Sequence, residues 1–442
     1  MTHPSEPDRT VHGEASLLRA VGALALTAAV INVIVGGGVF RMPTTLWNEM
    51  GPAAPLALVA GALAIIPIAL CFAAVGSRTH ATGGPYTYVS ATFGAFAGFI
   101  AGALMWIGNV TSSAGVASAL TEQVAALAPG MATPGARAAL LVGTYGVLFA
   151  LNAFGVKLGS RAIAALATLK LTPLFLLAAI GVFFVDWSQV TFAPAAIPSL
   201  SALGASMVLV MFAYSGMETA LVPSGEVRDP ARDVPRATMA AILLCVLLYI
   251  GVQVVAQGTL GARLADSRVP LADAAGTLWD PARTLLLLTA CVSMVGFMMG
   301  NLLGSSRLLY ALGRDGYLPR AIGNVNARTR VPIAALVMHA GIALALALAG
   351  DFDTLALVSG GAICLVYITV CLAAWRAQRL DIRERGTPFV LPGGAAIPAL
   401  SVLAMGAIVL TLKPEEWQAI GIALVVLVLV YAAVRALRNR AA

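Results

Sequence analysis

Residues 29–43 read AVINVIVGGGVFRMP, an apolar run that contains Gly36, Gly37 and Gly38 in succession and Pro43 shortly after them. Glycine costs about 1 kcal/mol relative to alanine inside a helix, and proline removes a backbone hydrogen bond. Three glycines followed by a proline therefore predict a helix that breaks near its middle.

A second apolar run is interrupted in the same way. Residues 211–226 read MFAYSGMETALVPSGE, where Gly216 is followed by the acidic Glu218 and then by Pro223. This run also predicts a broken helix.

The rest of the chain is too apolar for a soluble protein. Of its 442 residues 60% are hydrophobic and only 11% are charged, whereas soluble domains carry about 25% charged residues. A spanning helix needs about 20 apolar residues, and lipid excludes open strand edges, so the long apolar segments predict an all-α membrane protein. The twelve predicted spans are 20–47, 53–76, 94–121, 138–153, 161–185, 201–223, 237–258, 283–311, 332–350, 354–375, 391–412 and 416–436.

The net charge of +7 has a distribution that favours a membrane explanation over nucleic-acid binding. Of the 27 Lys and Arg residues, twenty lie on one predicted side of the membrane and five on the other. Arg41 and Lys170 fall inside predicted spans. The protein is expected in the inner membrane of the cell, and the positive-inside rule then predicts that both termini lie in the cytoplasm. Residues 1–12 are polar and have no apolar region after a basic one, so no cleaved signal peptide is expected, and residues 1–19 are expected to form a cytoplasmic tail.

The two interrupted helices are the first and the sixth, five helices apart. Interrupted segments at corresponding places in two halves point to a transporter site, although glycines can also serve close helix packing. The predicted halves are inverted repeats at 20–185 and 201–375, with two additional helices at 391–436.

Broken helix ends predict the chemistry of this site. Gly36 opens the first break, and the free amides of Gly37 and Gly38 begin a half-helix that favours a carboxylate. The exposed carbonyls of Ile34 and Phe212 can accept hydrogen bonds from an ammonium group. Donors and acceptors at one place suit an α-amino acid.

Four stretches of sequence, in order, resemble the amino acid, polyamine and organocation transporter superfamily, specifically its bacterial amino acid permeases. The resemblance covers nearly the whole chain, and it implies a five-plus-five inverted repeat of the leucine-transporter type and alternating access. The stretches are IVGGGVFRMP at 34–43, ATGGPYTYVSATFG at 81–94, FAYSGMETALVPSGEVRDPARDVPRA at 212–237 and SSRLLYALGRDGYLP at 305–319.

Lys170 is the only lysine in a predicted span. An unpaired charge in lipid costs at least about 2.5 kcal/mol, and a buried amine can exchange a proton as its surroundings change between wet and dry. The resemblance implies that Lys170 replaces the sodium ion of sodium-coupled relatives, with its amine near Gly36 and Ser293. The alternative is a structural lysine that extends to the membrane surface.

The resemblance also implies roles for other polar groups. Glu218 either takes part in the proton response or in the intracellular gate, or else holds unwound backbone donors. Asn109 either faces the substrate or bonds a neighbouring helix. Phe212 matches an aromatic gate. The same comparison assigns substrate contacts to Ser215, Asn301 and Gly360.

Arg41 lies outside the resembled pattern. Two roles are open for it: attracting anionic groups, or pairing with a carboxylate such as Glu49.

The pocket residues and the resemblance leave several function classes open. Gly37 and Asn301 replace a hydroxyl and an aromatic group of the resembled arginine/agmatine exchanger, and we find no second carboxylate beside Glu218, so a neutral amino acid is favoured. Proton-coupled symport is the first hypothesis, antiport of an amino acid against an amine or another amino acid is the alternative, and a non-transporting receptor is the alternative of another class.

An enzyme is not expected, because the spans hold no metal-ligand spacing and His339 is isolated. We expect the five cysteines to be packing thiols, and no cofactor other than the coupling proton. The expected partners are the amino acid and the lipid bilayer. The oligomeric state, monomer or homodimer, stays open.

Overall fold

A computed structural model describes residues 22–78, 83–154, 160–221, 227, 229–383, 387–412 and 414–441. The described chain is all-α, as predicted, and holds no β-strand. The predicted tail at 1–19 lies outside the described residues. In order, the principal helices are α1 (Ala23–Ile34), α2 (Gly38–Met50), α3 (Ala54–Gly76), α4 (Pro85–Phe93), α5 (Ala95–Leu127), α6 (Pro134–Ala153), α7 (Ser160–Gly181), α8 (Leu200–Tyr214), α9 (Met217–Ala220), α10 (Pro230–Leu260), α11 (Pro270–Leu278), α12 (Asp280–Arg314), α13 (Ile333–Ala349), α14 (Phe352–Arg379), α15 (Ala396–Val409) and α16 (Pro414–Ala441).

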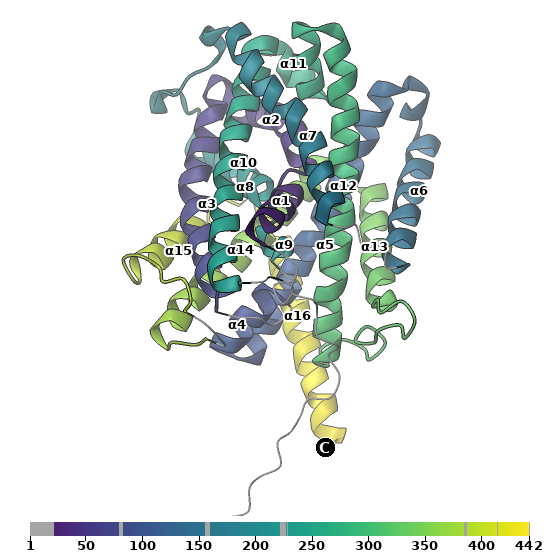
Figure 1. The fold of residues 1–442 in the computed structure, drawn as a ribbon, viewed down its shortest axis with the longest axis vertical. Helices are drawn as coiled ribbons and strands as arrows, with labels where there is room; N and C mark the ends of the chain where they lie inside the picture. The colour runs from purple at the N-terminus through teal and green to yellow at the C-terminus, as the bar shows by residue number, and fades with distance from the viewer. Residues whose placement is uncertain are drawn as a thin grey trace, which may run out of the picture.

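These helices form a single bundle (Figure 1). Seven helical stretches in the described residues are long and apolar enough to cross a membrane, and five shorter apolar helices accompany them. Large apolar side chains such as Leu63, Leu247 and Leu403 point outward, each about 70% exposed. Water disfavours such a surface, whereas lipid accepts it. The chain is a multi-pass membrane protein, and the number of twelve crossings stays a prediction.

Both predicted breaks are present. Residues 35–37 separate α1 from α2, and residues 215–216 separate α8 from α9. Gly216 has a φ of +127°, a backbone conformation that disfavours any residue with a Cβ. A Cβ built there would lie 3.0 Å from the amide nitrogen of Ile34. The two breaks are therefore in contact with each other at the centre of the bundle.

The long helix α5 occupies the middle of the bundle and lies against both α12 and α14. The predicted boundary between the two halves falls in the connection between α7 and α8. The inverted repeat itself, at 20–185 and 201–375, stays a prediction, as does the separate grouping of 391–436.

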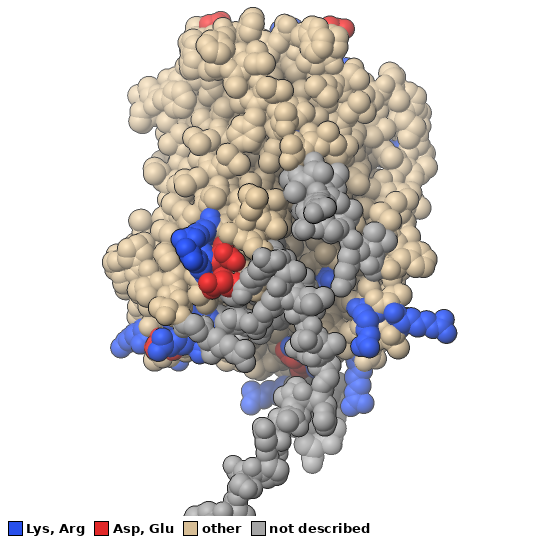
Figure 2. Space-filling model, in the orientation of Figure 1, with Lys and Arg blue, Asp and Glu red and all other residues tan. Residues whose placement is uncertain are grey.

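On the face drawn in Figure 2, basic side chains gather toward one end of the molecule. Figure 2 shows most Lys and Arg of this face at the lower end, where the C-terminus lies in Figure 1, below a broad band without charge. On the same face, the acidic groups at the upper end are few. This asymmetry is what the positive-inside rule requires of a membrane protein.

Candidate functional site

A small pocket lies between the two breaks. Its volume is about 10 Å³, room for about one water molecule. The amino acid expected from the sequence is far larger, so this pocket as it stands cannot hold one. Its lining includes the predicted residues Ile34, Gly36, Gly37, Gly38, Phe212 and Ser215, together with Val33, Ser112, Val116, Ala213 and Phe297.

The amides and the carbonyls at the first break differ in whether they already have hydrogen-bond partners. α2 begins at Gly38 with Gly37 as its N-cap, and the first amides of a helix have no acceptor within it. The carbonyl of Ile34, by contrast, already accepts from the Gly36 amide at 2.8 Å and from the Tyr249 hydroxyl at 2.9 Å. A carbonyl has two lone pairs, so an ammonium group must displace one of these donors.

The carbonyl of Phe212, at the end of α8, is occupied in the same way. Phe212 O accepts from the Ser215 hydroxyl at 2.7 Å and from the Ser215 amide at 3.2 Å. A ligand donor could therefore reach this carbonyl only by replacing one of these two bonds.

Aromatic rings form two walls of the pocket. Phe297 of α12 lies so close to the first break that a Cβ on Gly36 would be 2.8 Å from its ring. Phe212 packs edge-on against Phe352 of α14, with ring centroids 5.8 Å apart. The resembled exchanger has an aromatic residue at the position of Asn301, which lies in α12. In this chain Phe297, one helical turn earlier in α12, is the aromatic residue at the pocket.

Three residues expected in the pocket, Asn109, Asn301 and Gly360, are not among those that line it in this structure. Asn109 accepts a hydrogen bond from Thr219 at 3.3 Å, which is the helix-to-helix role left open above. Asn301 is buried beside Ser305. Gly360 is a packing position, since a Cβ there would lie 2.5 Å from the carbonyl oxygen of Val208 in α8.

Ser112, Val116 and Phe297 are lining residues that the sequence reading missed. Ser112 is one helical turn beyond Asn109 in the same polar stretch, so its helical spacing could have indicated it. Val116 and Phe297 carry no polar signal, and only the packing of α5 and α12 brings them to the breaks.

Lys170 caps the broken end of α1. Its ammonium nitrogen donates to the carbonyls of Asn32 and Val35, each at 2.7 Å. The Ser293 hydroxyl of α12 donates to the same Val35 carbonyl at 2.9 Å. Lys170 is 1% exposed, so it does not extend to the membrane surface. It lies beside the first break and shares the Val35 carbonyl with Ser293, and its role in proton coupling stays a prediction.

Glu218 holds the second break. Its two carboxylate oxygens accept from the Gly216 amide at 2.9 and 3.0 Å, and the Tyr367 hydroxyl donates to it at 2.9 Å. The carboxylate thus satisfies an unwound backbone donor, which is the structural role considered above. Its partner Tyr367 connects the break to α14.

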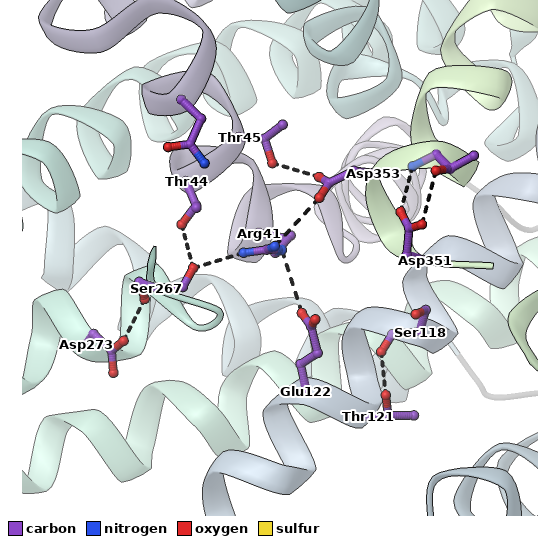
Figure 3. A network of polar contacts seen from close by, with 12 residues as sticks. Arg41, Thr44, Thr45, Ser118, Thr121, Glu122, Ser267, Asp273, Asp351 and Asp353 are labelled. Carbon is purple, nitrogen blue, oxygen red and sulfur yellow. Dashed lines mark hydrogen bonds and ion pairs between the residues drawn. The ribbon is translucent and has the colours of Figure 1, made fainter. Parts of the chain in front are cut away.

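Arg41 does not pair with Glu49, contrary to the pairing given above as an example. Figure 3 shows its guanidinium between Glu122 of α5 and Asp353 of α14, with nitrogen-to-oxygen distances of 3.6 Å to each. It also donates to the Ser267 carbonyl at 2.9 Å. Glu49 is near in sequence, but the α2 backbone directs Arg41 toward other helices.

Within the described ranges, no group of three or more His, Cys, Asp or Glu side chains could hold a metal ion. The breaks and the pocket between them combine backbone groups, apolar walls, the Ser112 and Ser215 hydroxyls, the Lys170 amine and the Glu218 carboxylate.

A family profile described as "Amino acid permease" matches residues 21–434. The chain belongs to the amino acid permease family. Among its relatives, the branched-chain amino acid permease BcaP of Bacillus subtilis is 27% identical, over 88% of this chain and 87% of the relative. The serine/threonine exchanger SteT of the same organism is 26% identical, over 84% of this permease and 85% of the exchanger. The vacuolar cationic amino acid transporter 4 of Arabidopsis thaliana is 25% identical, over 82% and 64%.

Proposed function

We propose that this permease is a proton-coupled symporter that carries neutral L-amino acids across the inner membrane by alternating access. The observation that carries the proposal is the contact of the Lys170 ammonium with the carbonyls of Asn32 and Val35 at the broken end of α1.

Proton coupling follows from the position of this amine. The last carbonyls of a helix lack intrahelical donors, and the helix dipole there favours a cation. A protonated Lys170 therefore holds the end of α1 against α7. A neutral Lys170 keeps two N–H donors, but it loses the charge that the helix dipole favours and its hydrogen bonds become weaker, so its hold on α1 is reduced. Binding and loss of one proton would alternate the two states of the first break.

The substrate class follows from the pocket walls. Among the residues that line it, none is charged, so a charged side chain would be buried without a partner at high cost. The α-carboxylate fits the amides of Gly37 and Gly38, and the ammonium fits the carbonyls of Ile34 and Phe212. Valine, alanine and phenylalanine walls suit an aliphatic side chain. The similarity to a branched-chain amino acid permease supports this choice.

The proposed topology has twelve spans, two inverted repeats and both termini in the cytoplasm. Its support is the one-sided charge distribution in Figure 2 and the contact between the breaks of α1/α2 and α8/α9. In this scheme Lys170, Ser293 and Glu218 lie on the elements that change position during transport.

A second candidate is an amino acid exchanger, favoured by the similarity to a serine/threonine exchanger. It uses the same pocket and leaves Lys170 as a fixed cap of α1.

Transport in proteoliposomes separates these candidates. Uptake of radiolabelled leucine, valine, alanine, serine, arginine and glutamate is measured in sodium-free buffer, with and without an inward proton gradient, into empty and preloaded vesicles. The symporter predicts gradient-stimulated uptake of a neutral amino acid into empty vesicles. Uptake only into preloaded vesicles, indifferent to the gradient, would establish the exchanger. Binding without either flux would identify a receptor.

A further inference from the structure

The Arg41 network lies on one side of the pocket and joins four separate elements. Arg41 belongs to α2, Glu122 to α5 and Asp353 to α14. Ser267 follows the 3-10 helix η7 (Gly261–Asp266) and precedes α11. Its carbonyl accepts from Arg41 and, at 2.7 Å, from Thr44. One guanidinium thus connects the half-helix after the first break to three of its neighbours (Figure 3).

The members of this network lie next to, or one to two helical turns from, residues of the pocket and its walls. Arg41 is three residues beyond Gly38, which is about one helical turn. Asp353 immediately follows Phe352, whose ring packs on Phe212 of the pocket wall. Glu122 is six residues beyond the lining residue Val116, or about 9 Å along α5. Opening the pocket on this side therefore requires Arg41 to leave its carboxylates.

The ion pairs are arranged so that they can separate. Both distances are 3.6 Å, longer than a hydrogen bond. Arg41 Nε and Glu122 Oε2 are buried without a hydrogen-bond partner. The side chains of Arg41, Glu122 and Asp353 are 15%, 26% and 42% exposed, so water can replace the partners as the network opens. These ion pairs can therefore hold the helices together and still separate when water enters.

The segment around Ser267 is held to the same network. The Ser267 hydroxyl donates to Asp273 of α11 at 2.6 Å, and Arg283 pairs with Asp273 at 3.1 Å. Thr45 of α2 donates to Asp353 at 2.8 Å. When α2 moves, η7 and α11 lose their main polar attachment to it.

We infer that Arg41 is the latch of a gate that closes the pocket toward the side of α11. Its ion pairs with Glu122 and Asp353 and its hydrogen bond to Ser267 hold α2, α5, α14 and the η7–α11 segment together. Their release opens the pocket on that side. The inference rests on the proposed alternating access, and it assigns a role to an arginine outside the family pattern.

Labelling of a pocket cysteine tests the latch without any transport measurement. Ser112→Cys places a reporter in the pocket lining, and a membrane-impermeant thiol reagent is applied to the side on which α11 lies. A cysteine introduced at the exposed Asp266 identifies that side. The protein with its five native cysteines and without the reporter gives the background.

Arg41→Gln should raise the labelling rate of the reporter about ten-fold, equivalent to about 1.4 kcal/mol in the gate equilibrium. Asp353→Asn, at a more exposed position, should raise it in the same direction and serves if Arg41→Gln does not fold. Arg41→Lys keeps the charge and should give an intermediate rate. Arg263→Gln is the matched control, because Arg263 is exposed on η7 and has no ion pair among the described contacts.

Unchanged labelling in both Arg41→Gln and Asp353→Asn would overturn the latch, and so would an equal increase in Arg263→Gln. Failure of the proposed transport has a different signature. In that case the Arg41 variant still raises labelling, while the unmodified protein moves no amino acid in proteoliposomes.

Discussion

Replacing Glu218 with alanine tests its role as the acceptor at the second break. The change removes every acceptor of the Gly216 amide and of the Tyr367 hydroxyl given by the structure. A buried donor left without an acceptor costs about 1–3 kcal/mol, so two such donors cost about 2–6 kcal/mol. Loss of the buried carboxylate relieves its own desolvation and offsets part of this cost. We expect a net destabilisation of about 2–3 kcal/mol.

The assay is thermal unfolding of the purified protein in detergent, for a matched series of variants. Glu218→Gln keeps one acceptor oxygen and nearly the same shape, so its melting temperature should lie between those of the unmodified protein and Glu218→Ala. Tyr367→Phe removes one donor and should also be milder than Glu218→Ala. Glu49→Ala, in α2, removes a carboxylate without a hydrogen-bond role in the described contacts and should change little. Equal melting temperatures for Glu218→Ala and the unmodified protein would refute the acceptor role.

Two further predictions concern close contacts of glycines. Gly36→Ala should push the Phe297 ring into the pocket, because the added Cβ would lie 2.8 Å from it, and uptake at equal expression should fall at least about ten-fold. Gly38→Ala, whose nearest contact is at 3.3 Å, should retain most of the uptake. The reverse order of the two variants would contradict the pocket geometry. Gly360→Ala should separate α14 from α8, because the Cβ would meet the backbone oxygen of Val208 at 2.5 Å. A loss of about 2 kcal/mol or more is expected from such overpacking, seen as a lower melting temperature, and an unchanged melting temperature would show that the helices can move apart at no cost.

The breaks could be predicted from the sequence because their cause is local. Three glycines in succession, and Gly216 two residues before an acidic group, disfavour a continuous helix whatever surrounds them. Lys170 could be placed for a related reason, since a lone charge in an apolar segment must find a partner. Its bond to helix-one carbonyls required the family resemblance as well.

The pocket walls and the long-range ion pairs could not be predicted from the sequence in this way. Phe297 and Val116 are ordinary apolar residues, and they become lining only through the way in which α12 and α5 cross the breaks. Arg41 pairs with carboxylates at positions 122 and 353, far away in sequence, so the nearby Glu49 was the wrong partner. Gly360 was assigned to the pocket by comparison alone, although its close approach to α8 is a packing contact.

The central claim is that Lys170 couples transport to protons, and proteoliposomes of the unmodified protein and Lys170→Ala test it most directly. Uptake of the best neutral amino acid is recorded together with proton entry, in sodium-free buffer across a range of external pH, with Arg263→Gln at an exposed position as a control. We expect that Lys170→Ala loses gradient-driven uptake and substrate-dependent proton entry, while exchange with preloaded amino acid continues and Arg263→Gln behaves like the unmodified protein. Gradient-driven uptake in Lys170→Ala with an unchanged pH dependence would contradict this claim.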